Sequence, residues 1–248
     1  MKIIIKLSGK IIDNKDAFNN FIGKLKKLTL RNKVILIHGG GIQVSSWMEK
    51  LSLKPKFVEG LRFTDDDTLE VVISVLCGLI NKKLVYELIN YGFKKVLGLS
   101  CIDDKLVVTD IDEKLGYVGK NVLNVNTNLI NFLFNNKYLL VISSVGLGKK
   151  DNKFVITNIN ADNVVYALAS HLKADKVIFL TDKEGVLDED NKVIRKLSLK
   201  EIDELIAKKI VTEGMIPKLS AIKDMFKRGV SQVIITSDLG KVGTSIVK

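Results

Sequence analysis

Two lysines stand at positions where a lysine side chain could bind a phosphate group. Lys6 follows the apolar run Ile3–Ile5 and precedes a turn that contains Gly9, while Lys218 follows Pro217 at the expected start of a helix. A lysine at either position offers a mobile positive charge to an anion. The helix dipole disfavours Lys218 unless an anion binds beside it. Taken alone, Lys6 also fits a solvated charge at a strand end.

A glycine triplet, Gly39–Gly41, ends the apolar run Val34–Ile37 and precedes a segment of helical character from residue 43 to 51. Consecutive glycines lack Cβ atoms, so their backbone N–H groups can approach an anion closely, and the dipole of the following helix adds to that attraction. A plain turn would also explain the pattern. We interpret the triplet as a candidate anion-binding loop.

Polar residues at three further places could bind a substrate. Asn158 and Asp162 stand before the helical pattern of residues 164–172, where Asp162 could equally serve as a helix cap. Arg62 has the fork geometry to grip a carboxylate, although a lone arginine is often a surface charge. The segment 181–187 follows an expected strand and contains a glycine, as ligand-binding turns of open α/β sheets do.

Along the chain, strand-like runs alternate with helical ones. This alternation predicts a mainly parallel sheet with helices on both faces, which would position these residues. The pattern from 101 to 126 indicates β-hairpins at the sheet margin, and a second hairpin is predicted near 148–152. Strands are expected at 2–6, 34–37, 95–99, 139–143, 176–180 and 232–236, and helices at 14–28, 43–52, 66–90, 127–136, 162–172, 199–208 and 217–228.

Composition narrows the function classes. The 248 residues are 46% hydrophobic and 6% aromatic, with a net charge of +11 from scattered lysines, so we predict a packed globular protein that binds no nucleic acid. No apolar run is long enough to span a membrane, and we expect a cytoplasmic location. Cys77 and Cys101 have no metal-ligand spacing and read as reduced core residues, and we expect no protein-held metal site.

Eight segments in order make the chain resemble the amino-acid kinase superfamily, and within it the N-acetyl-L-glutamate kinases. They span nearly the whole chain: KLSG (6–9), HGGG (38–41), GLRFT (60–64), LGYVG (115–119), NINAD (158–162), LTDKEGVL (180–187), TEGMIPK (212–218) and GTSIV (243–247). The chain begins at its first strand, so it is similar to the short, dimeric, arginine-insensitive members.

The resemblance implies a three-layer αβα sandwich around a mainly parallel sheet of about eight strands. It implies one kinase domain over 1–248, with a lobe over 1–172 for the acyl amino acid and dimerisation and a lobe over 173–248 for the nucleotide. The implied reaction is ATP-dependent phosphorylation of the side-chain carboxylate of N-acetyl-L-glutamate in arginine biosynthesis, and the implied cofactors are ATP and Mg²⁺. A homodimer is the implied assembly.

Roles follow from the resemblance alone. Lys6 and Lys218 would stabilise the transferring phosphoryl group, and Asp162 would orient both lysines. The acyl amino acid would be bound by Gly40, Gly41, Arg62 and Asn158. The nucleotide would be bound by Gly9, Asp182, Lys183, Glu184, Gly185, Val186, Leu187, Ile210, Val211 and Thr212.

Three departures and several alternatives remain open. Ser8 replaces a glycine usual in the first turn, Ile42 follows the glycine triplet, and the chain between Ile235 and Gly243 is about ten residues shorter than is usual in the family. The same chemistry could act on N-succinylglutamate or on a carrier-linked aminoadipate, and aspartokinase and uridylate kinase fit less well. A non-catalytic ligand sensor is the alternative of another class.

Overall fold

In the computed structural model, residues 1–208, 210–211 and 215–248 are described, with Lys10 described by its backbone alone. The chain divides into two compact units. The first contains Met1–Val34 and Leu168–Lys248, and the second contains Ile35–Ala167. No helix of the described part has the length and apolar content to cross a membrane.

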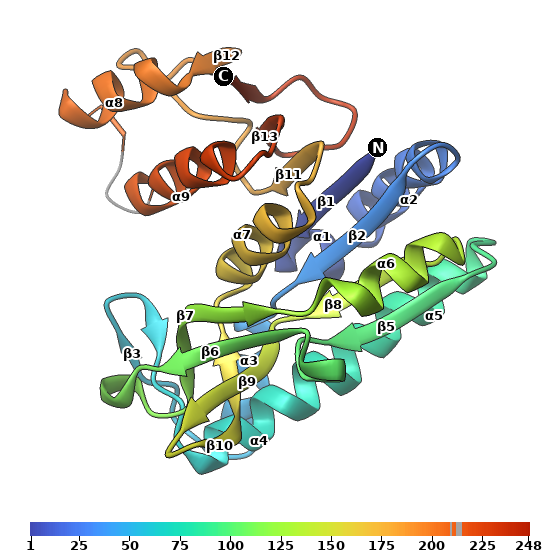
Figure 1. The fold of residues 1–248 in the computed structure, drawn as a ribbon, viewed down its shortest axis with the longest axis vertical. Coiled ribbons are helices and arrows are strands. Elements are labelled where there is room, and N and C mark those ends of the chain that lie inside the picture. Colours follow the sequence, from blue (N-terminus) through green and yellow to red (C-terminus); the bar gives the residue numbers. More distant parts are fainter. Residues whose placement is uncertain (209, 212–214) are drawn as a thin grey trace. The chain divides into compact units, whose positions relative to one another are not determined.

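The first unit holds five strands of the main sheet, in the order β12-β14-β13-β11-β1. Neighbours pair in parallel except β13 with β14. Figure 1 shows α8 and α9 in orange and red beside these strands. The elements are β1 (Lys2–Leu7), α1 (Gly9–Asp13), α2 (Lys15–Thr29), β11 (Lys176–Leu180), β12 (Lys196–Ser198), α8 (Leu199–Ala207), α9 (Ile216–Lys227), β13 (Gln232–Thr236) and β14 (Thr244–Val247).

The second unit supplies three more strands of the sheet, in the order β2-β8-β5, all parallel. Their residues read as apolar runs because strands covered on both faces have no solvent side. The elements are β2 (Lys33–His38), α3 (Gly41–Lys50), a short hairpin of β3 (Phe57–Val58) and β4 (Leu61–Arg62), β5 (Val96–Ser100), α6 (Thr127–Asn135) and β8 (Leu139–Ser143). Helix α7 (Ala161–Leu172) begins in this unit and ends in the first.

The predicted hairpins form, but the predicted place of the 101–126 stretch at the sheet margin is wrong. They close into a four-stranded barrel of their own, in the order β10-β7-β6-β9 (Figure 1, green to yellow). The barrel closes because β10 pairs with β7, and β6 with β9, in parallel across long stretches of sequence. Its strands are β6 (Val107–Ile111), β7 (Val118–Val125), β9 (Val145–Lys150) and β10 (Lys153–Ile159), with 3₁₀ turns at Asp103–Lys105 and Glu113–Leu115.

The helix predicted over 66–90 forms, with an interruption in its middle. It runs as α4 (Asp66–Ile73), a π-helical stretch over Ser74–Ile80, and α5 (Asn81–Asn90). Asp65 caps its start by accepting a hydrogen bond from the Thr68 backbone N–H at 3.0 Å. A π-helical turn inside a helix often accompanies a functional site, and here it lies against the glycine triplet, as described below.

The predicted fold class is confirmed: eight strands, mainly parallel, form the central sheet, and helices cover both of its faces. All six predicted strands and all seven predicted helical segments are present, whereas β12 and β14 were not predicted. The assignment of ligands to lobes over 1–172 and 173–248 stays a prediction, since the compact units are defined by packing and not by ligands.

Candidate active site

The sequence-predicted residues fall in both compact units, and each group is described within its own unit. Gly40, Gly41, Arg62, Asn158 and Asp162 belong to the second unit. The remaining predicted residues belong to the first unit: Lys6, Gly9, Asp182–Leu187, Ile210, Val211 and Lys218. Thr212 lies outside the described residues.

The glycine turn lies between the end of β2 and the start of α3, as its pattern predicts. A Cβ at Gly40 would overlap the Ile80 side chain and lie 2.8 Å from Leu76 Cδ2, both in the π-helical stretch. A Cβ at Gly41 would meet no atom within 4 Å. Gly40 is therefore required by close packing, while the space beside Gly41, the first residue of α3, is open.

His38 is a fully buried side chain beside the glycine turn. Its Nδ1 lies 2.9 Å from the Gly39 carbonyl oxygen, which can only accept, so Nδ1 carries the proton. Its Nε2 then accepts a hydrogen bond from Asn81 Nδ2 at 3.2 Å. Burial lowers the pKa of His38 to about 4, against a smaller opposing effect of the Gly39 bond, so the ring is neutral at pH 7.

Asn81 sits at the first position of α5 and joins three structural elements. Its Nδ2 lies 3.1 Å from the Leu99 carbonyl oxygen on β5 and 3.0 Å from the Val141 carbonyl oxygen on β8. A Cβ at Gly98 would overlap Asn81 Oδ1, so a glycine at that position makes room for the amide. The amide thus fixes His38, and through it the start of the glycine turn, against two strands of the sheet.

Arg62 is buried and already oriented. Its Nη2 donates to the Gly41 carbonyl oxygen and to Ser45 Oγ, each at 2.8 Å, and its Nη1 lies 3.2 Å from Met48 Sδ. The guanidinium also lies 4.7 Å from the centre of the Phe57 ring. Burial lowers the pKa of Arg62, although an arginine stays charged at neutral pH. A fixed positive charge beside an open glycine turn suits a carboxylate ligand.

Three of the sequence motifs meet at Thr64, which is fully buried. Its backbone carbonyl accepts from the Tyr117 N–H at 2.7 Å, and the Tyr117 carbonyl accepts from the Asn158 N–H at 2.9 Å. The Asn158 side chain donates from Nδ2 to Thr64 Oγ1 at 3.2 Å. A Cβ at Gly116 would overlap the Thr64 carbonyl oxygen, and its φ of +76° also favours glycine.

Asp162 lies in the first turn of α7, and another residue caps that helix. Asn160 Oδ1 accepts from the Asp162 backbone N–H at 2.9 Å, so the cap does not use the Asp162 carboxylate. A Cβ at Gly39 would touch Ala161 Cβ at 3.4 Å, which places the start of α7 beside the glycine turn. One turn later, burial raises the pKa of Tyr166 and the negative charge of Asp162 raises it further.

In the first unit, Lys6 and Lys218 come from the ends of different elements. Lys6 is the second-last residue of β1 and pairs in register with Phe179 of β11. Gly9 begins α1 directly after the strand. Lys218 lies in the first turn of α9, with Pro217 beside it as predicted, and its Nζ lies 5.4 Å from the centre of the Phe179 ring.

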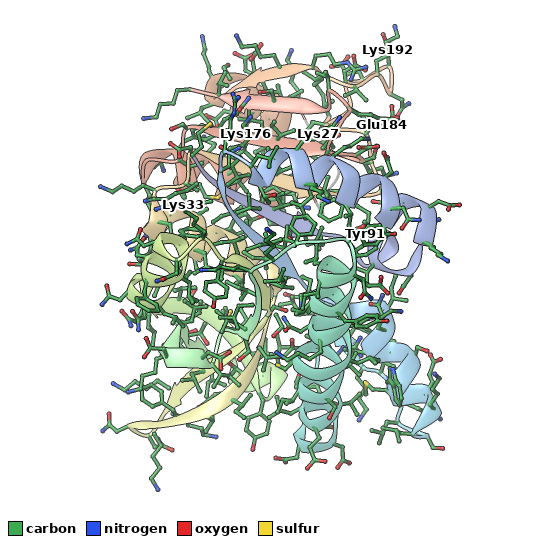
Figure 2. The ribbon with its side chains drawn as sticks, turned by 90° about the vertical axis from the view of Figure 1, so that its right-hand side faces the viewer. Lys27, Lys33, Tyr91, Lys176, Glu184 and Lys192 are labelled. Carbon is green, nitrogen blue, oxygen red and sulfur yellow. The ribbon has the colours of Figure 1, made fainter. Side chains whose placement is uncertain are left out.

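The segment after β11 is a turn held by Thr244 at the start of β14. The Val186 N–H donates to Thr244 Oγ1 at 2.7 Å, and a Cβ at Gly185 would lie 2.5 Å from that oxygen. Asp182, Lys183 and Glu184 are exposed, and Lys241 lowers the pKa of Glu184 through an ion pair at 2.8 Å. Figure 2 shows Glu184 at the surface of this unit.

Two shorter segments of this unit are held by their own contacts. The Ile210 N–H donates to the Leu205 carbonyl at 3.0 Å, and Val211 is buried. The short connection after β13 is tied to α2: Asp238 accepts from Lys24 Nζ at 2.5 Å and from Asn20 Nδ2 at 2.7 Å. Burial raises the pKa of Asp238, but the hydrogen bonds from Gly240, Lys24 and Asn20 outweigh it and the pKa is lowered.

Sequence reasoning did not find the residues that hold the predicted ones in place. Ser45, Asn81 and the side chain of Thr64 have no motif of their own. His38 stands in the HGGG segment, but no role was assigned to it. One signal was available: an asparagine inside the apolar helical pattern of 66–90 is unusual and invites the question of what it binds.

Comparison with known sequences gives full-length matches. Residues 1–237 match the amino acid kinase family. The chain is 39% identical to the acetylglutamate kinase of Endomicrobium trichonymphae, over 99% of this chain and 98% of that protein. It is 38% identical to the acetylglutamate kinase of Methanopyrus kandleri, over 94% of each chain.

Comparison with solved structures gives the same fold. The protein smu.665 from Streptococcus mutans UA159 superposes with a TM-score of 0.85 at 31% identity, over 99% of this chain and 98% of that one. The carbamate kinase of Giardia lamblia bound to AMP-PNP has a TM-score of 0.76 at 18% identity, over 100% and 98% of the two chains. The second similarity concerns the fold alone.

Proposed function

Because this chain belongs to the amino acid kinase family, we propose that it transfers the γ-phosphoryl group of ATP to the side-chain carboxylate of N-acetyl-L-glutamate. The product is N-acetyl-L-glutamyl 5-phosphate, an intermediate of arginine biosynthesis. Identities of 38–39% to acetylglutamate kinases, over nearly the full length of both chains, support the substrate as well as the reaction.

The observation that carries the proposal is the position of Arg62 beside the glycine turn. The substrate has two carboxylates, one to be held and one to react. Arg62, fixed by Gly41 and Ser45, offers a buried positive charge to the α-carboxylate, with Asn158 as a second donor. Gly40 and Gly41 then offer backbone N–H groups to the reacting carboxylate and the phosphoryl oxygens.

The chemistry requires positioning and charge neutralisation. A side-chain carboxylate oxygen attacks the γ-phosphorus, the bond to the β,γ-bridging oxygen breaks, and ADP leaves with that oxygen. The carboxylate is ionised at pH 7, so no general base is needed. In this proposal Lys6 and Lys218 stabilise the charge that develops on the phosphoryl oxygens. The role of Asp162 in orienting the lysines joins residues of different units and stays a prediction.

For the nucleotide, we propose Gly9, the turn Asp182–Leu187 and the segment Ile210–Thr212 as contacts. Among the described residues, no three acidic, histidine or cysteine side chains gather in one place. In this proposal Mg²⁺ is therefore bound mainly by the ATP phosphates, which is a common mode for this ion. It would supply further neutralisation of phosphate charge, while the named residues bind and orient the reactants.

The assembly and the location complete the proposal. We expect a homodimer in the cytoplasm that is insensitive to arginine. Light scattering coupled to size-exclusion chromatography tests the first point, because a dimer has twice the 27.6 kDa of one chain. Turnover measured with and without added L-arginine tests the last.

ATP-dependent acyl-phosphate formation, trapped with hydroxylamine, tests the function. N-acetylglutamate, N-succinylglutamate and free glutamate are compared side by side. We expect a hydroxamate from N-acetylglutamate and little from the other two. A preference for N-succinylglutamate would mean that the proposed reaction is right and that the substrate carries a different acyl group. No hydroxamate from any acceptor, with ATP still bound, would contradict the proposal and favour a ligand sensor.

A further inference from the structure

We infer that Phe179 is a positioning residue for Lys218, acting through a cation–π contact in the first unit. The inference rests on the proposed function, which gives Lys218 its task at the phosphoryl group. Its starting point is a pair of neighbours that no sequence motif connects: the ammonium of Lys218 lies 5.4 Å from the centre of the Phe179 ring. That separation is within the range in which an aromatic face attracts a cation.

The position of Lys218 explains why it needs such a contact. It stands in the first turn of α9, which contains no acidic residue and begins after the apolar N-cap residue Met215. The positive end of the helix dipole therefore repels the ammonium. The negative face of an aromatic ring opposes that repulsion.

The position of Phe179 explains how the contact is held. It is fully buried in β11 and pairs in register with Lys6 of β1. Side chains alternate between the two faces of a sheet, and residues in register share a face. The side chains of Lys6 and Phe179 therefore point to the same face of the sheet. The ammonium of Lys218 lies over the ring of Phe179. The ring of Phe179 is therefore next to Lys6 in the sheet and in contact with Lys218, the two lysines that the proposed reaction needs.

The ring of Phe179 is held by a rigid strand, so contact with it restricts the motion of the flexible Lys218 side chain. A lysine has four rotatable side-chain bonds, and fixing it in one place costs conformational entropy. Lys218 is half-buried, so its contact with the ring is stronger than it would be in open water. The ring reduces the freedom of the ammonium before the substrate binds, and this preorganisation contributes to catalysis.

Graded fluorination of the ring tests the inference. Replacing Phe179 by mono-, di- and pentafluorophenylalanine weakens the negative ring face stepwise at nearly constant shape. We expect kcat to fall with each step, to about one tenth at the last, with both KM values within about twofold. The same series at Phe226 is the matched control. Phe226 is fully buried in α9, and within the described residues no lysine or arginine lies over its ring.

A second measurement needs no activity. With ¹³C-methylated lysines, the Lys218 signal, identified by its loss in Lys218→Arg, should be shifted upfield by the ring current and return to the usual position in Phe179→Leu. Absence of a shift in the wild-type protein, or a kcat that does not change along the fluorine series, would overturn the inference. If the wild-type protein forms no acyl phosphate, the proposed function fails, while the ring-current shift still decides the contact.

Discussion

Asn158 Nδ2 donates a hydrogen bond to Thr64 Oγ1 at 3.2 Å, across 94 residues of sequence. Thr64 also donates from Oγ1 to the backbone carbonyl of Arg62 at 3.1 Å. One buried hydroxyl therefore connects the two residues proposed to bind the α-carboxylate of the substrate. The position of each depends on the other, and this dependence can be measured.

Thr64→Val removes the hydroxyl and keeps the shape of the side chain. We expect a rise of severalfold in KM for N-acetylglutamate, because Asn158 loses its acceptor. A destabilisation of about 1 kcal/mol should accompany it, since the half-buried amide of Asn158 loses its acceptor and the Arg62 carbonyl loses its donor. Initial rates and urea unfolding measure the two effects. An unchanged KM for the acyl amino acid would show that Asn158 does not touch it.

Arg62→Lys keeps the positive charge and loses the fork. We expect KM for N-acetylglutamate to rise at least about tenfold with a smaller change in kcat, because one ammonium cannot make the contacts with Gly41 and Ser45 that hold the guanidinium in place. Ser45→Ala is the companion variant: it keeps Arg62 and removes one of its two oxygen acceptors at Nη2. A smaller rise is expected there. An effect limited to KM for ATP would show that Arg62 contacts the nucleotide and not N-acetylglutamate.

The adjacent glycines Gly40 and Gly41 should respond differently to alanine. Gly40→Ala drives a methyl group into Ile80 and Leu76, which should cost about 1–3 kcal/mol by overpacking. Gly41→Ala has open space and lies at a helix start, so the free energy of unfolding should stay within about 0.5 kcal/mol. Thermal unfolding of both variants compares them directly. Equal losses would mean that the packing of Gly40 against the π-helical stretch is not as described.

The neutral state of His38 should make stability depend on pH. Its pKa is about 4 in the folded protein against 6.5 in the unfolded chain, because burial disfavours the charged ring. The unfolded state then binds more protons between these values, so stability is full above about pH 6.5 and falls as the pH approaches 4. This difference between the two pKa values corresponds to about 3 kcal/mol of stability.

Carboxylates also titrate in the lower part of that range, so the His38 pKa should be followed by its own signal. The imidazole Cε1–H resonance in a two-dimensional NMR titration reports it directly. A midpoint near 4 agrees with a buried neutral ring. A midpoint near 6.5 would contradict the described hydrogen bonds with Gly39 and Asn81.

Lys218→Ala should lower kcat by about 10²–10³-fold and leave the binding of both substrates largely intact, because its charge matters most in the transition state. Lys223→Ala is the matched control on the same helix, since that lysine pairs with the exposed Asp203. Steady-state rates together with equilibrium ATP binding separate the effects. Near-normal turnover of Lys218→Ala would remove this lysine from the reaction.

Much of the fold could be predicted because its main signals are local. Apolar runs such as Val34–Ile37 predict buried parallel strands, and the glycine triplet predicts the turn that follows this run. The strands β12 and β14 were missed because they contain three and four residues, too few for a periodic pattern. The barrel was misplaced because its closure depends on the parallel pairing of β6 with β9 and of β7 with β10, which no local pattern encodes.

The candidate site divides in the same way. Residues such as Arg62 and Asn158 stand in recognisable motifs, so their importance could be predicted. The residues that fix them could not, because their partners are distant in sequence. His38 and Asn81 are 43 residues apart, and the amide also needs the space left by Gly98. Which hydroxyl or amide reaches a given partner is decided by packing and not by the residue's own type.

The most direct measurement follows an oxygen atom. N-acetylglutamate carrying ¹⁸O in its side-chain carboxylate is incubated with ATP, Mg²⁺, the enzyme and hydroxylamine, and the phosphate released is examined by ³¹P NMR. Attack of the carboxylate on the γ-phosphorus puts one ¹⁸O into the P–O bond, and hydroxylamine then attacks the carbonyl carbon and releases phosphate with that ¹⁸O. The account predicts one ¹⁸O in each phosphate. Phosphate without ¹⁸O would mean that water received the phosphoryl group and would contradict it.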